Sequence, residues 1–131
     1  MWDQRIQIPV DRVHDGDTLY DVYVDEGERH YHYEDIRLLG VFAPELDDPG
    51  GPECRQFVLD WIKDVLASYG TNPPKWPFVR INARMKVKDA EQKTLDRFVS
   101  TITNMDGTRN LNAEIIQFVH ENGYSGGTGS Q

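Results

Sequence analysis

Residues 5–41 read RIQIPVDRVHDGDTLYDVYVDEGERHYHYEDIRLLGV, and this stretch decides the fold. Apolar and polar residues alternate in three runs, a pattern that is typical of half-buried β-strands. The Asp15-Gly16 pair separates the first run from the second, and residues 25–28 predict a hairpin turn before the third. We therefore expect three consecutive antiparallel strands at the start of the chain.

The rest of the chain predicts two helices and two more strands. Apolar residues recur at helical spacing from Pro52 to Gly70, and residues 79–88 alternate strictly between apolar and mostly basic side chains. A fifth strand is expected at about residues 95–104, before a helix that ends at Asn122-Gly123. The order βββαββα predicts a β-rich α+β fold, a five-stranded Greek-key barrel of the OB type with two helices. Residues 1–124 would form this single domain, and residues 125–131 a flexible Gly/Ser-rich tail.

The composition of the 131 residues excludes several classes of protein. No apolar run approaches the length of a membrane span and no leader peptide opens the sequence, so we expect a cytoplasmic protein. Cys54 is the single cysteine, which excludes an intrachain disulfide and a thiolate metal cluster. We expect it to be a buried, apolar residue of the first helix.

The formal net charge of −8 is unevenly distributed. Residues 1–50 carry 13 acidic and 4 basic side chains, net −9, whereas residues 51–131 carry 9 acidic and 10 basic ones, net +1. Between Lys75 and Arg97, seven basic residues stand against three acidic ones. A phosphate-bearing partner would approach this basic segment against an unfavourable overall field.

The turn Asp15-Gly16-Asp17-Thr18 places two carboxylates and a hydroxyl close together between two strands. Hard cations such as Ca²⁺ select clustered oxygens of this kind. Asp-Gly is also a common turn dipeptide, so a purely structural turn remains an alternative. An EF-hand is excluded, because no Glu closes a twelve-residue loop.

The order of motifs along residues 5–124 resembles that of the staphylococcal nuclease (thermonuclease-like) family. The matching motifs are Asp15-Gly16-Asp17-Thr18, an Arg37-Leu38-Leu39 strand leading to Pro44-Glu45, Gly51-Pro52-Glu53 at a helix start, Arg97 after a basic strand, and Asp106-Gly107 before Leu111-Asn112-Ala113-Glu114. The resemblance implies an OB barrel that hydrolyses phosphodiester bonds in DNA and RNA with Ca²⁺.

The resemblance also implies roles for five residues. Asp17 would be a metal ligand, with Asp15 supporting it, and Glu45 would be the general base that orients the attacking water. Arg37 and Arg97 would hold the phosphate oxygens in the transition state. These residue types suit the reaction, because a cation and arginine forks stabilise the charge that grows on the phosphate, and a carboxylate accepts a proton from water.

Each catalytic role has a structural alternative. The alternatives are an ion pair of Arg37 with Asp35 or Glu34, a loop cap by Glu45, and an ion pair of Arg97 with Asp96 or Asp89. The third predicted strand leaves two further choices. Its histidines form a transition-metal site or an exposed hairpin face, and its tyrosines, with one from the second strand, form a base-stacking platform or cross-strand packing. The residues concerned are His30 and His32 with Glu34, and Tyr23, Tyr31 and Tyr33.

Four positions depart from the family's pattern. Phe42 stands where the family has a second metal-binding Asp, and Ala43 where it usually has Thr, so the Ca²⁺ site is expected to be incomplete. Leu95 replaces a Tyr that would lie beside the nucleotide, and Thr94 replaces a Lys. Nucleotide affinity is therefore expected to be reduced.

Three functions from different classes follow. The first is a monomeric, metal-dependent nuclease that acts on DNA or RNA, preferentially single-stranded, and is slowed by the loss of the ligand at Phe42. The second is a catalytically inactive OB module that binds nucleic acid or a protein partner. The third, favoured by the net charge of −8, is an interaction domain unrelated to nucleic acid.

Overall fold

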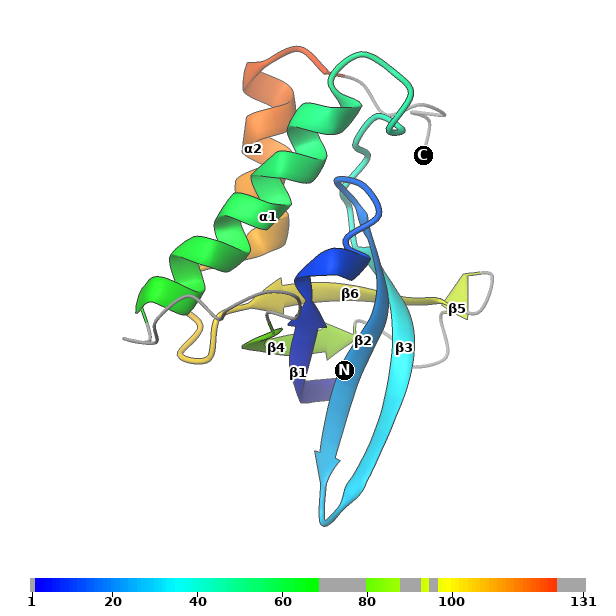
Figure 1. Ribbon diagram of the computed structural model, residues 1–131, viewed down its shortest axis with the longest axis vertical. Helices are drawn as coiled ribbons and strands as arrows, with labels where there is room; N and C mark the ends of the chain where they lie inside the picture. Colours follow the sequence, from blue (N-terminus) through cyan, green and yellow to red (C-terminus); the bar gives the residue numbers. More distant parts are fainter. Residues whose placement is uncertain (1, 69–79, 88–92, 95–96, 125–131) are drawn as a thin grey trace.

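The computed structural model describes residues 2–68, 80–87, 93–94 and 97–124, which form a β-barrel with two α-helices packed over one end (Figure 1). The elements in chain order are β1 (Trp2–Pro9), the short 3-10 helix η1 (Val10–Arg12), β2 (Thr18–Gly27), β3 (His30–Leu38), α1 (Gly51–Ser68), β4 (Arg80–Val87), β5 (Lys93–Thr94), β6 (Arg97–Thr103) and α2 (Leu111–Glu121). This architecture confirms the predicted OB-type barrel.

Strand pairing closes the barrel through one parallel contact. The strands follow the order β3-β2-β1-β4-β6-β5, and an additional pairing joins β3 to β6. The β3–β6 pairing is parallel and sets Asp35 beside Arg97 and Leu38 beside Ser100, whereas the other pairings are antiparallel. The antiparallel pairing expected for the first three strands is observed, and β5 is a two-residue addition to the edge of β6.

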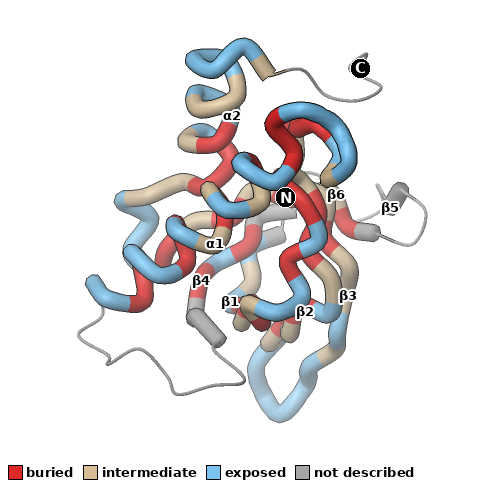
Figure 2. The backbone as a smooth tube through the Cα atoms, turned by 45° about the horizontal axis from the view of Figure 1, so that its top comes forward, coloured by how far each residue is buried: buried red, intermediate tan, exposed pale blue. Residues whose placement is uncertain are grey.

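The core fills the barrel and continues beneath the helices, as the buried segments in Figure 2 show. Both helices turn an apolar face toward it, and they also contact each other. The rings of Phe57 in α1 and Phe118 in α2 stack with centroids 4.6 Å apart. Trp61 donates a hydrogen bond of 3.0 Å from Nε1 to Glu114 Oε2 of α2. The two helices therefore form one layer over the barrel end.

A buried asparagine holds α2 onto the barrel. The Nδ2 group of Asn112 donates to the carbonyl oxygens of Leu39 and Ser100, each at 3.0 Å, and its Oδ1 accepts from Ile102 N at 3.0 Å. Leu39 follows β3, and Ser100 and Ile102 belong to β6. One amide side chain thus satisfies backbone groups on both sides of the parallel pairing, where unsatisfied groups would be costly.

The β2–β3 hairpin turns two residues later than expected. Gly27 pairs with His30, so Glu28 and Arg29 form the turn, with φ values of 52° and 68°. A two-residue turn with positive φ at both positions matches the right-handed twist of the strands. Gly27, with φ of 82°, lies beside a shift in the register and not at the centre of the turn. The sequence suggested otherwise because glycine is the usual turn residue.

Other expectations about the elements are confirmed. Helix α1 begins one residue before Pro52, and α2 ends before Asn122-Gly123. Cys54 is fully buried in α1, and burial raises the pKa of its thiol to about 11.

Some of the expectations concern positions that lie outside the described residues, namely Gly70, residues 75–77 and the tail 125–131. None of the helices in the described ranges is both apolar enough and long enough to cross a bilayer.

Candidate functional site

The loop that precedes β2 lies directly against the helical layer. The backbone N–H groups of His14 and Asp15 both donate to the carbonyl of Thr18, at 3.0 and 3.4 Å, which closes the turn. A Cβ atom at Gly16 would lie 2.7 Å from the Cβ atoms of both Ala43 and Cys54. Only glycine allows this approach, which brings the two aspartates of the loop beside the segment that leads into α1.

Asp17 joins this loop to the end of β3 and to the segment before α1. Its carboxylate accepts from the Thr18 hydroxyl at 2.9 Å and from the backbone N–H of Ala43 at 3.2 Å. Its carbonyl oxygen accepts from Leu38 N at 2.8 Å. The orientation of the Asp17 carboxylate is therefore fixed from both sides, while each oxygen keeps a further lone pair.

Arg37 lies next to Asp17, with 3.8 Å between Nη2 and Asp17 Oδ2. Its Nη1 group donates to the carbonyl oxygens of Leu38 at 3.3 Å and Val41 at 3.0 Å. The guanidinium lies 5.3 Å from the centroid of the Phe42 ring. Among the described residues, Asp17 is the carboxylate at ion-pair distance from Arg37, so the alternative pairing with Asp35 or Glu34 is not observed.

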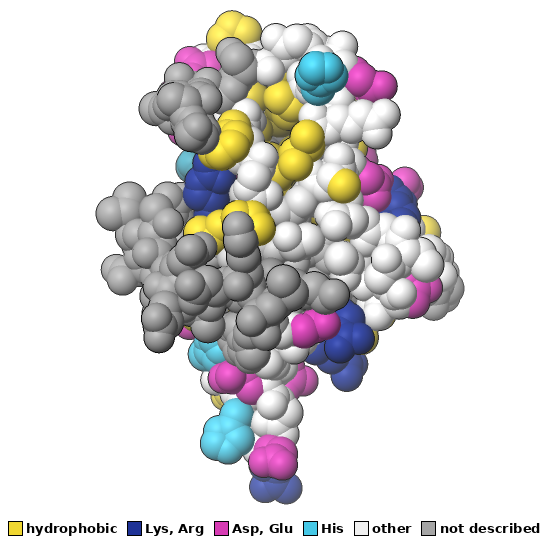
Figure 3. All heavy atoms as spheres, turned by 180° about the vertical axis from the view of Figure 1, so that it is seen from behind, with side chains coloured by type: hydrophobic (Ala, Val, Ile, Leu, Met, Phe, Trp, Pro, Cys, Tyr) yellow, Lys and Arg dark blue, Asp and Glu magenta, His cyan; other side chains and the backbone are white. Residues whose placement is uncertain are grey.

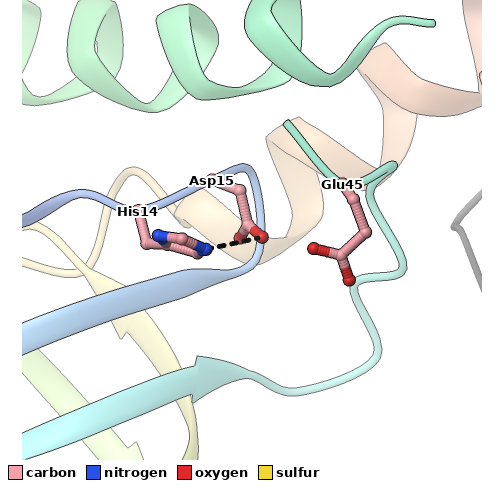
Figure 4. Close-up of side chains that lie close together, drawn as sticks. All are labelled: His14, Asp15 and Glu45. Atoms are coloured by element: carbon pink, nitrogen blue, oxygen red, sulfur yellow. Dashed lines mark ion pairs between the residues drawn. The ribbon is translucent and has the colours of Figure 1, made fainter. Parts of the chain in front are cut away.

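Asp15 and Glu45 face each other across the two loops, as Figure 4 shows. Asp15 is 3% exposed, and its Oδ1 accepts from Asp17 N at 3.1 Å. Burial, then a side-chain hydrogen bond with Asp17 and the charges of Asp17 and Glu45, raise the pKa of Asp15 to about 7, whereas the hydrogen bond from the Asp17 backbone N–H lowers it. The buried Asp15 thus lies beside two further carboxylates, an arrangement that a bound cation would relieve.

The backbone of the loop before α1 sets the position of Glu45. The Glu45 carbonyl accepts from Asp48 N at 2.9 Å, and Gly51 N donates to the Asp48 carbonyl at 2.9 Å. A Cβ atom at Gly51 would overlap the Glu45 carbonyl oxygen, so this close turn requires glycine. The main chain of Glu45 closes the turn, while its exposed side chain is directed toward Asp15 (Figure 4).

His14 completes a group that can hold a metal ion. One ligand atom each from His14, Asp15 and Glu45 lie within 4.8 Å of one another, and His14 Nε2 is 3.9 Å from Asp15 Oδ2. The oxygen donors of this group and of Asp17 suit Ca²⁺, whereas the imidazole nitrogen suits a transition metal. His14 was not predicted from the sequence, although its position directly before the Asp15-Gly16 turn was an available signal.

The structure thus brings four of the five predicted site residues to one end of the barrel: Asp15, Asp17, Arg37 and Glu45. The fifth, Arg97, begins β6, and its backbone pairs with Asp35, two residues before Arg37 on β3. The side chain of Arg97 and the positions Asp89, Leu95 and Asp96 lie outside the described residues. Phe42 is 37% exposed beside Arg37 and offers no ligand atom.

The β2–β3 hairpin carries the two other sets of candidate residues. His32 is bound between two carboxylates, with Nδ1 2.7 Å from Glu34 and Nε2 3.2 Å from Glu26. The rings of Tyr23 and Tyr31 stack at 5.2 Å, and Tyr33 meets Tyr23 edge-on at 5.6 Å. The three tyrosines therefore contact one another across β2 and β3, with Tyr31 and Tyr33 exposed, and this cluster lies on strands remote from the helical layer (Figure 1).

A shallow hollow of about 220 Å³ lies beside Phe42, between the end of β3 and α2. Figure 3, which views the molecule from behind, shows hydrophobic side chains grouped in its upper half. Ile116 of α2 is 44% exposed there and lines the hollow with Phe42. On the same face, Lys and Arg side chains lie at separate places and not in one continuous patch (Figure 3).

No model of a known protein family matches the chain, and no curated protein sequence matches it. The function is therefore inferred from the geometry of the site.

Proposed function

We propose that this protein is a metal-dependent phosphodiesterase that hydrolyses single-stranded DNA or RNA. One observation carries the proposal: the carboxylates of Asp15 and Glu45 come together with His14, and the neighbouring Asp17 lies 3.8 Å from Arg37 at the same end of the barrel. A cluster of acids beside an arginine suits a substrate that is itself an anion bound through a cation. The resemblance to thermonuclease-like proteins supports the same reaction.

Arg37 would bind the phosphate. Its Nη1 group is already held by two backbone carbonyls, so the orientation of the planar guanidinium is set before substrate binds. An arginine has five N–H donors, and those not used by the carbonyls are available to phosphate oxygens. Fixed donors of this kind stabilise the negative charge that develops during hydrolysis, without the cost of reorganisation.

Glu45 would act as general base. It is exposed at the mouth of the site, on a loop held by Gly51 and Asp48, so its carboxylate can reach a water molecule in contact with bulk solvent. Asp15 and Glu45, with His14, would hold Ca²⁺, and Asp17, whose backbone N–H donates to Asp15, would add a further carboxylate. Bound Ca²⁺ would supply positive charge opposite the phosphate oxygens.

Metal-dependent cleavage tests the proposal. Purified protein is incubated with denatured DNA or with RNA in millimolar Ca²⁺, and in parallel with excess EDTA. We expect cleavage in Ca²⁺ that stops in EDTA, because the carboxylates of Asp15, Asp17 and Glu45, here called the acid cluster, would repel the phosphate in the absence of a metal ion. Absence of cleavage with Ca²⁺, Mn²⁺ and Zn²⁺ would reject the enzyme.

The Phe42→Asp variant should bind Ca²⁺ on the order of tenfold more tightly, because ligand charge count sets the affinity of such sites. Phe42 contacts Arg37, which in turn lies beside Asp17, so a carboxylate at this position would join the acid cluster. Calorimetric titration with Ca²⁺ measures the change. Phe42→Asn is the matched control, and an equal gain in both variants would show that removing the ring, and not adding charge, is responsible.

The alternative proposal is an inactive OB module that binds nucleic acid or a protein partner. Phe42 favours it, because this exposed ring occupies the side of Arg37 where a further ligand would be needed. Salt-dependent binding of single strands without cleavage would support binding of nucleic acid. Lack of any such binding would leave a protein partner as the remaining function of this alternative.

A further inference from the structure

A groove of about 560 Å³ opens beside the acid cluster, between η1, the start of β2 and the first turns of α1. Its volume is in the range of small-molecule sites. His14 both lines this groove and belongs to the group with Asp15 and Glu45, so the groove adjoins the proposed active site. Among the other lining residues are Asp11, Arg12, Tyr20, Arg55 and Gln56.

Two aromatic rings line this groove. The imidazole of His14 and the phenol ring of Tyr20 lie with centroids 5.1 Å apart and planes inclined by 37°. The side chain of His14 is 44% exposed, and Tyr20 is half-buried, so both rings are supported and still accessible. Aromatic surfaces of this kind bind nucleic-acid bases by stacking, largely without regard to sequence.

Arg55 provides a cation without a counter-charge. Its Nε donates to the Val13 carbonyl at 2.9 Å, which fixes the guanidinium at the groove wall. Within the described ranges, no carboxylate lies at ion-pair distance from Arg55. Arg12, the other arginine of the groove, is paired with Asp21 at 2.6 Å. Arg55 is therefore the group in the groove that can bind an anion, whereas Asp11 opposes a second one.

We propose that this groove binds one nucleotide unit of the substrate, with its base against Tyr20 and His14 and its phosphate on Arg55. The amide of Gln56, which also lines the groove, can hydrogen-bond the edge of the base. The inference rests on the proposed function for its substrate class. Because His14 belongs to both, the nucleotide bound in the groove would lie next to the group formed with Asp15 and Glu45.

Binding of uridine monophosphate in EDTA tests this inference independently of cleavage. Chemical-shift changes in the NMR spectrum locate the ligand, and titration gives its affinity. We expect shifts at His14, Tyr20 and Arg55, with weaker binding of uridine and of inorganic phosphate, because each probe lacks one half of the recognition. Absence of binding, or shifts confined to other surfaces, would overturn the inference.

Variants of the groove separate charge from packing. Arg55→Gln is expected to weaken binding of uridine monophosphate on the order of tenfold. Tyr20→Leu should weaken it by about five- to tenfold through loss of stacking. Lys63→Gln is the matched control, because it removes the same charge from an exposed position farther along α1. An equal loss of affinity in Lys63→Gln would show that the overall charge of the protein explains the effect of Arg55→Gln, and would contradict the inference.

Arg55→Lys controls for the structural role of Arg55, since it keeps the charge and loses the planar group that donates to Val13. We expect it to bind uridine monophosphate more tightly than Arg55→Gln, and equal affinities would overturn the inference. Cleavage and groove binding also fail separately. If the protein does not cleave nucleic acid but still binds the nucleotide at Arg55, the proposed enzyme activity is wrong and the subsite stands. If the protein cleaves nucleic acid but Arg55→Gln binds the nucleotide as tightly as the wild type, the activity stands and the subsite is wrong.

Discussion

Replacement of Glu45 by Gln is expected to lower metal-dependent cleavage of denatured DNA by about 10²- to 10⁴-fold, the usual contribution of a general base. Gln keeps the size and the polarity of the side chain but cannot take a proton from water. The backbone of Glu45, and not its side chain, closes the turn with Asp48, so the loop should keep its conformation. The initial rate at saturating Ca²⁺ measures the effect.

Saturating Ca²⁺ is needed because Glu45 also belongs to the group that can hold the ion. A titration with Ca²⁺ separates the two roles. If Glu45 is only a metal ligand, Glu45→Gln should regain full activity at high Ca²⁺. If Glu45 is the general base, the activity of the variant should stay low at every Ca²⁺ concentration. Glu28→Gln is the matched control, since Glu28 is exposed at the tip of the β2–β3 hairpin. Unchanged cleavage in Glu45→Gln at saturating Ca²⁺ would refute the assigned role.

Asp15→Asn is expected to stabilise the metal-free protein above pH 7 by up to about 4 kcal/mol. The pKa of Asp15 is raised to about 7 by burial and by its acidic neighbours, whereas an unfolded chain has an Asp pKa of about 3.9. Between these values the folded protein binds a proton that the unfolded chain has released. The free energy of unfolding contributed by Asp15 is therefore largest below pH 4 and is lost as the pH rises toward 7.

Urea unfolding in EDTA at pH 5 and pH 8 measures this prediction. From pH 5 to pH 8, the free energy of unfolding of the wild-type protein should fall relative to that of Asp15→Asn. An equal change with pH in both proteins would contradict this prediction. Added Ca²⁺ should reduce the advantage of the variant at pH 8, because an ion that binds only the folded wild-type protein stabilises it by mass action. Asp47→Asn, a change at an exposed loop carboxylate, should show no such pH dependence.

The barrel was predictable from local sequence because each strand alternates and each helix has its own periodicity. The parallel pairing of β3 with β6 was not, since it joins residues 35–38 to residues 97–100 and has no local signal. The hairpin turn at Glu28 and Arg29 was also misplaced, because positive φ at two non-glycine residues depends on the pairing of whole strands.

The residues of the candidate site that belong to a sequence motif were predictable, whereas those brought together only by packing were not. Asp15, Asp17, Arg37 and Glu45 were found through the order of motifs, and the structure brings them together. Arg55 and Tyr20 of the groove belong to no motif. Arg55 lies near His14 because α1 packs against the loop at Gly16, and Tyr20 does so because the loop turns back onto Thr18 at the start of β2.

The bridge made by Asn112 has a consequence for the order of assembly during synthesis. β6, whose pairing with β3 closes the barrel, is synthesised well after the acidic loops, and Asn112, which secures this pairing, follows later still. A nascent chain that ends before residue 111 has Asp15, Asp17 and Glu45 but lacks this bridge between β3 and β6. Any activity of this site should therefore appear only after residue 112 has been synthesised.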